Sequence, residues 1–384
     1  MDIVCFSHLR WDFVFQRPQH LLTRFADFSR VFYIEEAYFH SHEDWYEETI
    51  HGNIHVIKMH VCGEHDDPFA VARQKKLLHE VTAKYQFKEY VTWYYTPMAL
   101  PIAADLNPVA TVYDCMDELS AFKFAPTRLK ELEKELLRQA DVVFTGGYSL
   151  YHAKKHQHDN VHAFPSSIDK KHFKKARKNI VDPADQASIG GPRFGFYGVL
   201  DERFDISLIS EVAEKRPEWQ FVLIGPVVKI DPNALPKRDN IHYLGSKRYN
   251  ELPDYLSGWD IAMVCFALNE ATKFISPTKT PEYLAGGKPV ISTPIKDVVT
   301  TYGSTGLVDI AANADEFIAA AEKELARTDK REWLKKVDAF LAKESWDIIV
   351  NEMRSQIYQA IARKQLKHAP AEFFVVNKVL PVAS

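Results

Sequence analysis

The sequence predicts an α/β protein of two domains, each built on an open and mostly parallel β-sheet. The chain has 384 residues, which is too long for one ordinary hydrophobic core. Short runs of β-branched and aromatic residues recur along it, and amphipathic stretches typical of helices lie between them. A polar segment at 178–192, rich in Pro, Gly and Asp, interrupts this alternation and predicts a linker.

Before the linker, seven apolar runs predict the strands of the first sheet. They are DIVCFSH (2–8), RVFYIEE (30–36), IHVIKMH (54–60), EYVTWYYT (89–96), ATVYD (110–114), DVVFTGG (141–147) and VHAFPSS (161–167). We therefore place the first domain at residues 1–180.

After the linker, six more runs predict a second sheet in a domain at 190–345. They are RFGFYGVL (193–200), WQFVLIGP (219–226), NIHYLGS (240–246), DIAMVCF (260–266), KPVIST (288–293) and GLVDI (306–310). Amphipathic patterns predict helices at 205–216 and 314–328, and one long helix at 345–366. The sequence assigns no role to the tail, 369–384.

Composition excludes several classes of protein. Apolar residues make up 46% of the chain and charged residues 26%, so a disordered chain is excluded. The net charge of −4 gives no general attraction to nucleic acid. No run reaches about 18 apolar residues and no signal peptide is visible, so we expect a cytoplasmic protein. The four scattered cysteines fit a reducing compartment and show no metal-ligand spacing.

Familiar nucleotide and metal motifs are also missing, because the chain has no GxGxxG, no GxxxxGK[ST] and no HExxH. The sequence therefore does not require a metal ion or a bound cofactor. Ligands of open α/β sheets bind beyond the carboxyl ends of the strands. Two such domains joined by one linker predict a cleft between facing strand ends, and loops after strands should carry the chemistry.

The segment SPTKTPEYLAGG (276–287) offers an anion site. We predict Ser276 as the N-cap of a short helix and Pro277 as its first residue. The amides of Thr278 and Lys279, with the lysine ammonium, suit a phosphate group. Glu282 lies three residues after Lys279, on the same helical face, and is suited to accept hydrogen bonds from hydroxyl groups such as those of a ribose.

Several segments resemble GT-B glycosyltransferases, notably the retaining family-4 type. PEYLAGGKPVIST (281–293) is similar to their donor-nucleotide segment, and FGFYGVLDERFD (194–205), FVLIGP (221–226) and the 241–266 segment resemble other blocks of their second domain. In the first half, ADVVFTGGYSLYHAKK (140–155) and AFPSSIDKKHF (163–173) resemble further blocks, and HLRWDFVFQRPQHLL (8–22) is most similar to the teichuronic acid and exopolysaccharide subgroup. The resemblance covers about residues 1–365.

The resemblance implies two Rossmann-like domains facing a central cleft, with a terminal helix at 346–368 that crosses back to the first domain. It implies transfer of a sugar, with retention, from a nucleotide-diphosphate sugar to a glycan or lipid-linked acceptor in the synthesis of bacterial cell-surface polysaccharide. It further implies that the second domain holds the donor without a metal and that the first holds the acceptor.

Candidate donor residues lie in the loops after second-domain strands. Gly198 allows the backbone to approach a diphosphate, and the Arg203 guanidinium can meet phosphate oxygens. Gly225, Pro226 and Tyr249 are candidates for the base pocket. With Ser276, Thr278, Lys279 and Glu282 they complete the predicted donor site. For each residue the plain alternative is a turn, a helix cap or a surface side chain.

Candidate acceptor and catalytic residues lie in the first domain. Gln16, Arg17, Gln19 and His20 follow the first strand, and Arg17 could face the donor phosphates or the acceptor. His8, Asp114 and Asp117 follow strands, and an aspartate could take the proton of the acceptor hydroxyl. Plainer interpretations are the start of a helix at Gln19 and His20, helix capping by the aspartates, and a structural role for His8.

Two features leave alternatives open. Phe274 stands where the family has a first glutamate that contacts the donor sugar, although Pro277, Lys279 and Glu282 match the subgroup's P-x-K-x-x-E version. An epimerase of nucleotide sugars, or a non-catalytic binding module, therefore remains possible. The lysine-rich run 154–178 is either a solvated face or a peripheral contact with an anionic membrane.

Overall fold

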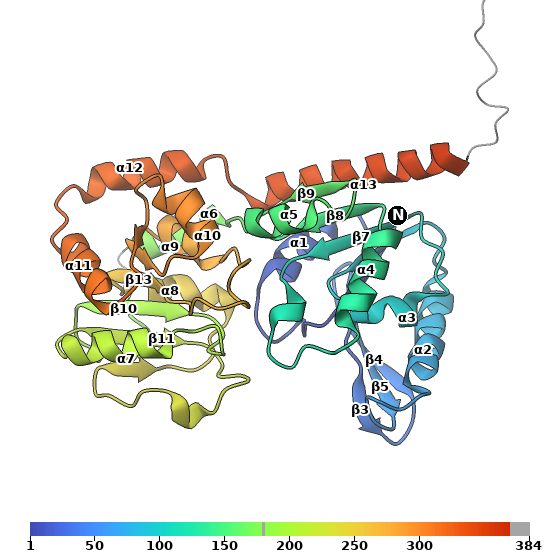
Figure 1. The fold of residues 1–384 in the computed structure, drawn as a ribbon, viewed down its shortest axis with the longest axis horizontal. Coiled ribbons are helices and arrows are strands. Elements are labelled where there is room, and N and C mark those ends of the chain that lie inside the picture. Colours follow the sequence, from blue (N-terminus) through green and yellow to red (C-terminus); the bar gives the residue numbers. More distant parts are fainter. Residues whose placement is uncertain (179–180, 369–384) are drawn as a thin grey trace, which may run out of the picture.

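The computed structural model describes residues 1–178 and 181–368, so the tail at 369–384 lies outside the described residues. Two α/β domains lie side by side, and the last helix returns along the first of them (Figure 1). The N-terminal sheet has the order β3-β5-β2-β1-β6-β7-β8-β9, with β4 paired to β5. All these pairs are parallel except β4 with β5, as expected for strands joined by helical crossovers.

The strands of this sheet are β1 (Asp2–Ser7), β2 (Val31–Glu35), β3 (Tyr38–Ser41), β4 (Trp45–His51), β5 (Ile54–Cys62), β6 (Tyr90–Tyr94), β7 (Ala110–Cys115), β8 (Val142–Thr145) and β9 (Val161–Ala163). Its helices are α1 (Arg17–Phe25), α2 (Ala70–Tyr85), α3 (Leu100–Ala103), α4 (Leu129–Gln139) and α5 (Tyr148–Lys154). The central strands β1, β6, β7 and β8 are buried along their whole length, which explains their continuous apolar runs.

The C-terminal sheet is entirely parallel, with the order β12-β11-β10-β13-β14-β15. Its strands are β10 (Arg193–Tyr197), β11 (Gln220–Ile224), β12 (Ile241–Tyr243), β13 (Ile261–Val264), β14 (Val290–Ser292) and β15 (Asp309–Ile310). Its helices are α7 (Ile206–Lys215), α8 (Leu252–Ser257), α9 (Lys279–Ala285), α10 (Lys296–Val298), α11 (Ala314–Leu325) and α12 (Lys330–Leu341). The predicted α/β class with parallel sheets in two domains is confirmed.

The chain enters the second domain earlier than the sequence predicted. Ile168, Phe173 and Ala176 lie in the C-terminal core, and α6 (Lys170–Phe173) contacts α8 and α9. Apolar side chains at 168–176 therefore belong to the second domain by packing, although the lysines around them made the run look like a solvated surface.

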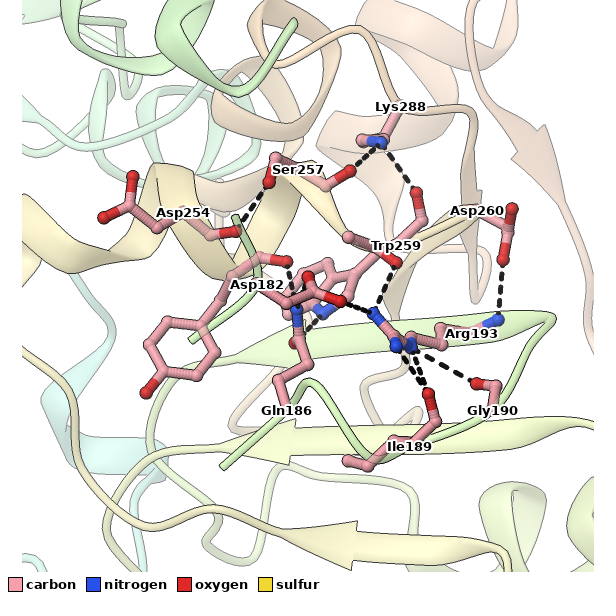
Figure 2. A network of polar contacts seen from close by, with 12 residues as sticks. Asp182, Gln186, Ile189, Gly190, Arg193, Asp254, Ser257, Trp259, Asp260 and Lys288 are labelled. Carbon is pink, nitrogen blue, oxygen red and sulfur yellow. Dashed lines mark hydrogen bonds and ion pairs between the residues drawn. The ribbon is translucent and has the colours of Figure 1, made fainter. Parts of the chain in front are cut away.

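The linker is anchored to the second domain by a polar network, shown in Figure 2. Arg193 Nη1 binds Asp182 Oδ2 at 2.5 Å, and Gln186 Nε2 donates to Asp182 Oδ1 at 3.0 Å. Gln186 Oε1 accepts the Trp259 indole N–H at 2.9 Å. Buried polar groups of a loop need such partners. The network fixes the start of β10, the strand that leads to the cleft.

The last helix, α13 (Trp346–His368), lies along the N-terminal domain (Figure 1). It contacts α1, β7 and β8. Its buried apolar residues belong to the core under the N-terminal sheet: Trp346, Ile349, Val350, Met353, Ile357 and Ala360. The N-terminal core thus includes residues from the other end of the chain.

The two domains also touch directly beside the cleft. Asp297 Oδ1 accepts a hydrogen bond of 2.9 Å from the Ser149 N–H and another from the Ser149 hydroxyl. Ser166 Oγ donates to the Ser276 carbonyl at 2.8 Å. Phe274, which replaces the family's first glutamate, packs against the N-terminal core and is an interdomain contact.

Candidate active site

A cleft of about 1150 Å³ lies between the domains, lined by loops of both. From the first domain come residues 11–16 and the segment 51–54, and from the second come the loops that follow β10, β11 and β12. Eight of the nine predicted donor residues line it: Gly198, Arg203, Gly225, Pro226, Tyr249, Thr278, Lys279 and Glu282. The sequence placed these residues in separate loops, and the fold brings them to one cavity.

Two glycines form the floor of this cavity because no side chain fits there. Gly198 and Gly225 have φ of +146° and +142°, which L side chains rarely adopt. A Cβ on Gly225 would lie 1.9 Å from the Gly198 carbonyl oxygen, so the two loops pack backbone against backbone. A Cβ on Gly198 would lie 2.3 Å from Lys279 Cε. The missing side chain is therefore what lets Lys279 lie across the end of β10.

Lys279 makes no ion pair with a carboxylate of the described residues. Its Nζ lies 5.5 Å from the ring centre of Phe196 and 5.4 Å from that of Phe266, and both rings are π-partners for the cation. No carboxylate oxygen of the described residues lies within 4.0 Å of this nitrogen. Burial, reinforced by the charge of Arg203, lowers the pKa of Lys279. A bound anion would relieve this cost.

Glu282 lies one helical turn from Lys279 in α9, and its side chain is buried. Its Oε2 accepts a hydrogen bond from the Tyr197 hydroxyl at 2.8 Å, while the Tyr283 hydroxyl accepts from the Tyr197 N–H at 3.0 Å. Its Oε1 has no hydrogen-bond partner among the described residues and borders the cleft. Burial raises the pKa of Glu282. One oxygen is thus positioned by the protein and the other is free for a ligand hydroxyl.

The prediction for Ser276 was wrong. The helix begins at Lys279, with Thr278 as its N-cap, so neither Ser276 nor Pro277 starts it. The Ser276 carbonyl instead accepts the Ser166 hydroxyl from the other domain, and Ser276 does not line the cleft. The contact of Ser276 with the other domain outweighs its local preference for capping a helix. Pro281 lies in the first turn of α9, where a residue without an N–H loses no helical hydrogen bond.

Tyr249 joins the two domains by ring stacking. Its ring lies between Phe15, at 4.3 Å between centres, and His172, at 4.4 Å. Phe15 comes from the N-terminal loop and is 38% exposed. The Tyr249 hydroxyl is buried without a partner among the described residues. Sequence reasoning missed Phe15, because only the contact across the cleft gives it a role.

Arg203 already has a partner, in contrast to Lys279. Its Nε and Nη2 bind the Asp201 carboxylate at 3.0 Å and 2.6 Å. Its guanidinium also lies 5.3 Å from the ring centre of Phe122, a residue of the first domain, and Lys229 Nζ lies 5.4 Å from the same ring. Arg203 thus faces the cleft with its charge partly balanced.

Asp117 is a first-domain residue that does not itself line the cleft. It follows β7, and its carboxylate interacts electrostatically with Arg203, Arg17 and Lys279. Burial raises the pKa of Asp117 to about 6, although these cations oppose the rise. A carboxylate with such a pKa can accept a proton near neutral pH.

Comparisons with known proteins agree with this geometry. Residues 191–327 match the family described as Glycosyl transferases group 1. The chain is 25% identical over 290 residues to the "Putative teichuronic acid biosynthesis glycosyltransferase TuaH" of Bacillus subtilis (strain 168), which covers 70% of this chain and 72% of the relative.

Similar solved structures include trehalose-6-phosphate from E. coli bound with UDP-2-fluoro glucose, with a TM-score of 0.70 and 11% identity. Another is sucrose-phosphate synthase from Thermosynechococcus elongatus, with a TM-score of 0.67 and 15% identity. Each similarity covers 94% of this chain and 99% of the other. The two show that the fold is GT-B. Residues 191–327 form a group 1 glycosyl transferase domain. The protein is a glycosyltransferase.

In this glycosyltransferase, Arg17 and Asp114 form a buried pair away from the cleft. Arg17 Nη2 binds Asp114 Oδ1 at 2.9 Å, and Nε lies 3.2 Å from both carboxylate oxygens. Arg17 Nη1 donates to the Phe164 carbonyl at 2.7 Å. The Asp114 side chain is 0% exposed. This differs from the predicted contacts with substrate, because the pair ties α1 to β7 and leaves no carboxylate oxygen free.

His8 follows β1, and its imidazole interacts electrostatically with Lys229 of the second domain. Burial, with a smaller effect of the Lys229 charge, lowers the pKa of His8 to about 4, so its imidazole is neutral at pH 7. Its Nδ1 is buried without a hydrogen-bond partner among the described residues. The structure places His8 near the second domain but does not place it in the cleft lining, and its catalytic role stays a prediction.

The polar residues beside Arg17 set the shape of the N-terminal loop. The Gln16 N–H donates to Gln19 Oε1 at 3.0 Å, and Gln19 Nε2 donates to the Trp11 carbonyl at 2.7 Å. His20 stacks on Trp346, at 4.6 Å between ring centres. Gln16 and Gln19 line the cleft, so this unusual cluster holds the loop that carries Phe15.

The described residues offer neither a cluster of metal ligands nor a helix that could span a membrane. Within the described part of the chain, no group of three or more His, Cys, Asp or Glu side chains could hold a metal ion. In the same residues, every helix is too short or too polar to cross a bilayer.

Proposed function

We propose that this glycosyltransferase moves a sugar from a nucleotide-diphosphate sugar to a hydroxyl group of an acceptor used in cell-surface polysaccharide synthesis. The observation that carries the proposal is the half-buried Lys279 ammonium, which has no carboxylate partner among the described residues, beside the side-chain-free floor at Gly198 and the free oxygen of Glu282. The relative's name, which refers to teichuronic acid biosynthesis, supports the pathway class. The E. coli structure, described as bound with UDP-2-fluoro glucose, supports the donor class.

In this proposal, Lys279, Arg203 and the Thr278 amide bind the diphosphate. The Gly198 backbone allows it to come close, and Glu282 Oε1 accepts a ribose hydroxyl. Tyr249, Gly225 and Pro226 border the base. Cations held in place before the reaction stabilise the charge that develops on the leaving diphosphate, and their cost is met during folding. Domain closure over the cleft excludes water and orients the acceptor.

Asp117 takes the proton of the acceptor hydroxyl. The bond between the sugar C1 and the diphosphate oxygen breaks, the acceptor oxygen bonds to C1, and the hydroxyl proton passes to Asp117. The charge of Asp117 interacts with those of Arg203 and Lys279, which supports placing the base on the side of the donor from which the diphosphate leaves. The acceptor therefore approaches the face from which the diphosphate leaves, and we propose retention of configuration. The anomeric signal of the product in ¹H NMR tests this, and an inverted product contradicts it.

We propose that the enzyme acts in the cytoplasm. Lys154, within the lysine-rich run, is buried and pairs with Glu118 and Glu133, so it cannot attract a membrane. Any contact with an anionic bilayer would involve the lysines of this run that remain exposed, which include Lys171, Lys175 and Lys178. Co-sedimentation with vesicles that contain anionic lipid tests this contact, and equal sedimentation with neutral vesicles contradicts an electrostatic one.

A thermal-shift screen against UDP, GDP, dTDP and CMP tests the donor site. At 100 times its dissociation constant, the correct nucleotide stabilises the protein by about 2.7 kcal/mol. The matching nucleotide sugar is then supplied with and without an acceptor extract, and release of nucleotide is measured. Release that depends on the acceptor supports transfer. Conversion of the donor sugar alone identifies an epimerase, and binding without any release identifies a non-catalytic module.

A further inference from the structure

A second cavity, of about 690 Å³, lies entirely within the N-terminal domain. It opens at the carboxyl ends of neighbouring strands, because Ser7 ends β1, Glu35 ends β2 and Thr96 follows β6, and all three line it. α2 and α3 close its sides through residues such as Val71 and Ile102. The carboxyl ends of parallel strands are where ligands of such sheets bind.

The walls of this cavity are mainly apolar. They are built by Phe6, Ile34, Met59, Val71, Met98 and Ile102. Pockets of about 300–1,000 Å³ with apolar walls and a few polar groups are typical sites for small organic ligands. Such walls do not suit a bare oligosaccharide, because its hydroxyl groups would lose their hydrogen bonds to water.

The mouth of the cavity is polar and carries more free carboxylates than cations. Asp67 is paired with Arg73 at 3.0 Å. Glu36 and Asp66 line the cavity, and their carboxylates have no partner among the described residues. Arg128 is the one arginine or lysine in the lining. The mouth therefore favours hydroxyl donors and disfavours a phosphate ester.

The second cavity shares a wall with the cleft. Glu35 lines the cavity, its Oε1 accepts the Trp11 N–H at 2.8 Å, and Trp11 lines the cleft. The two cavities therefore adjoin at Glu35 and Trp11, and a ligand whose tail fills the second cavity can extend its head toward the cleft on this side.

We propose that this cavity holds the apolar part of the acceptor, and that the acceptor is an uncharged amphiphile with a free hydroxyl group rather than a phosphorylated lipid or a bare glycan. The inference rests on the proposed function for the identity of the ligand as acceptor. The apolar tail occupies the space between Val71 and Ile102, and Glu36 and Asp66 accept hydrogen bonds from the head group.

The test is calorimetric binding of three probes, kept below micelle concentration: n-octyl β-D-glucoside, octyl phosphate and glucose. We expect saturable one-to-one binding of octyl glucoside, at least tenfold weaker binding of octyl phosphate and no binding of glucose. Val71→Trp fills the cavity from a half-buried helix position and is expected to weaken octyl glucoside at least tenfold. Val181→Trp, the same change at a site that is 90% exposed, is expected to bind like the wild type.

Ile102→Trp, on another wall, serves as a second filling variant if Val71→Trp fails to fold. The proposal is overturned if the wild type does not bind octyl glucoside, if octyl phosphate binds equally well, or if both folded filling variants bind normally. Nucleotide binding is measured in parallel, because the nucleotide occupies the other cavity. If the wild type binds the nucleotide but not octyl glucoside, this inference alone is refuted, whereas absence of nucleotide binding by the wild type refutes the proposed function.

Discussion

Replacing Lys279 with methionine tests two effects of its charge: tighter binding of the nucleotide and lower stability of the free protein. The ammonium lies between two aromatic rings, with no carboxylate of the described residues within 4.0 Å. A hydrogen bond to a charged group contributes about 1.5–3 kcal/mol. We expect a loss within this range, because Lys279 is one of the two cations proposed to bind the diphosphate. The Kd for the best nucleotide diphosphate should then rise roughly 10- to 150-fold.

The same substitution should stabilise the free protein. Burial and Arg203 lower the pKa of Lys279, which means that the folded state disfavours its charged form. At pH 7 the cation therefore reduces the free energy of unfolding, and methionine removes this cost. Each kcal/mol regained raises Tm by about 2–4 °C in a domain of this size.

Calorimetric titration gives the affinity, and a thermal melt without ligand gives the stability. Lys273→Met is the matched control, since Lys273 lies nearby, is 58% exposed and pairs weakly with Glu270. The reasoning is refuted if Lys279→Met binds the nucleotide like the control, or if its Tm without ligand falls.

Three other predictions concern the remaining parts of the site. Asp117→Asn should lower kcat about 10²- to 10⁴-fold with little change in nucleotide affinity. The kcat of the wild type should fall as pH decreases through about 6, because the base then becomes protonated. A kcat that does not change with pH in this range contradicts the role of Asp117 as base. Gly225→Ala should abolish nucleotide binding, because its Cβ would lie 1.9 Å from the Gly198 oxygen. The control is Gly245→Ala, at a glycine with φ of +66° but open space around it, which should bind the nucleotide normally. The argument is refuted if the two variants give the same nucleotide titration curve. Asp114→Asn should leave the Arg17 cation buried without its partner and lower the free energy of unfolding by about 3–5 kcal/mol; urea denaturation measures it, and a change below about 1 kcal/mol contradicts a structural pair.

The strands that the sequence predicted are those marked by a continuous apolar run. The apolar runs of β1, β7 and β10 are buried on both faces, so sequence alone predicts them. Strands β3 and β4, which both pair with β5, were missed because they are only partly buried and their mixed polar and aromatic residues form no continuous apolar run. The boundary near residue 168 was missed because lysines surround the three apolar anchors that enter the second core.

The site was predictable where chemistry and spacing coincide in one segment, as for Lys279 and Glu282. It was not predictable where a role depends on the other domain. Phe15 gains its place from Tyr249, and Ser276 is used by Ser166 instead of capping a helix. Asp114 and Arg17 were expected at the surface of the cleft, and only their distance of 2.9 Å shows that they neutralise each other.

The return of α13 to the first domain bears on how the chain acquires its structure during synthesis. Trp346, Val350 and Met353 fill the N-terminal core, yet the ribosome makes them after the whole second domain. A nascent chain that ends near residue 178 exposes the apolar floor of β7 and β8 to water. The first domain to emerge therefore reaches its final packing only after the second has been made, and in the interval it is a natural client for chaperones.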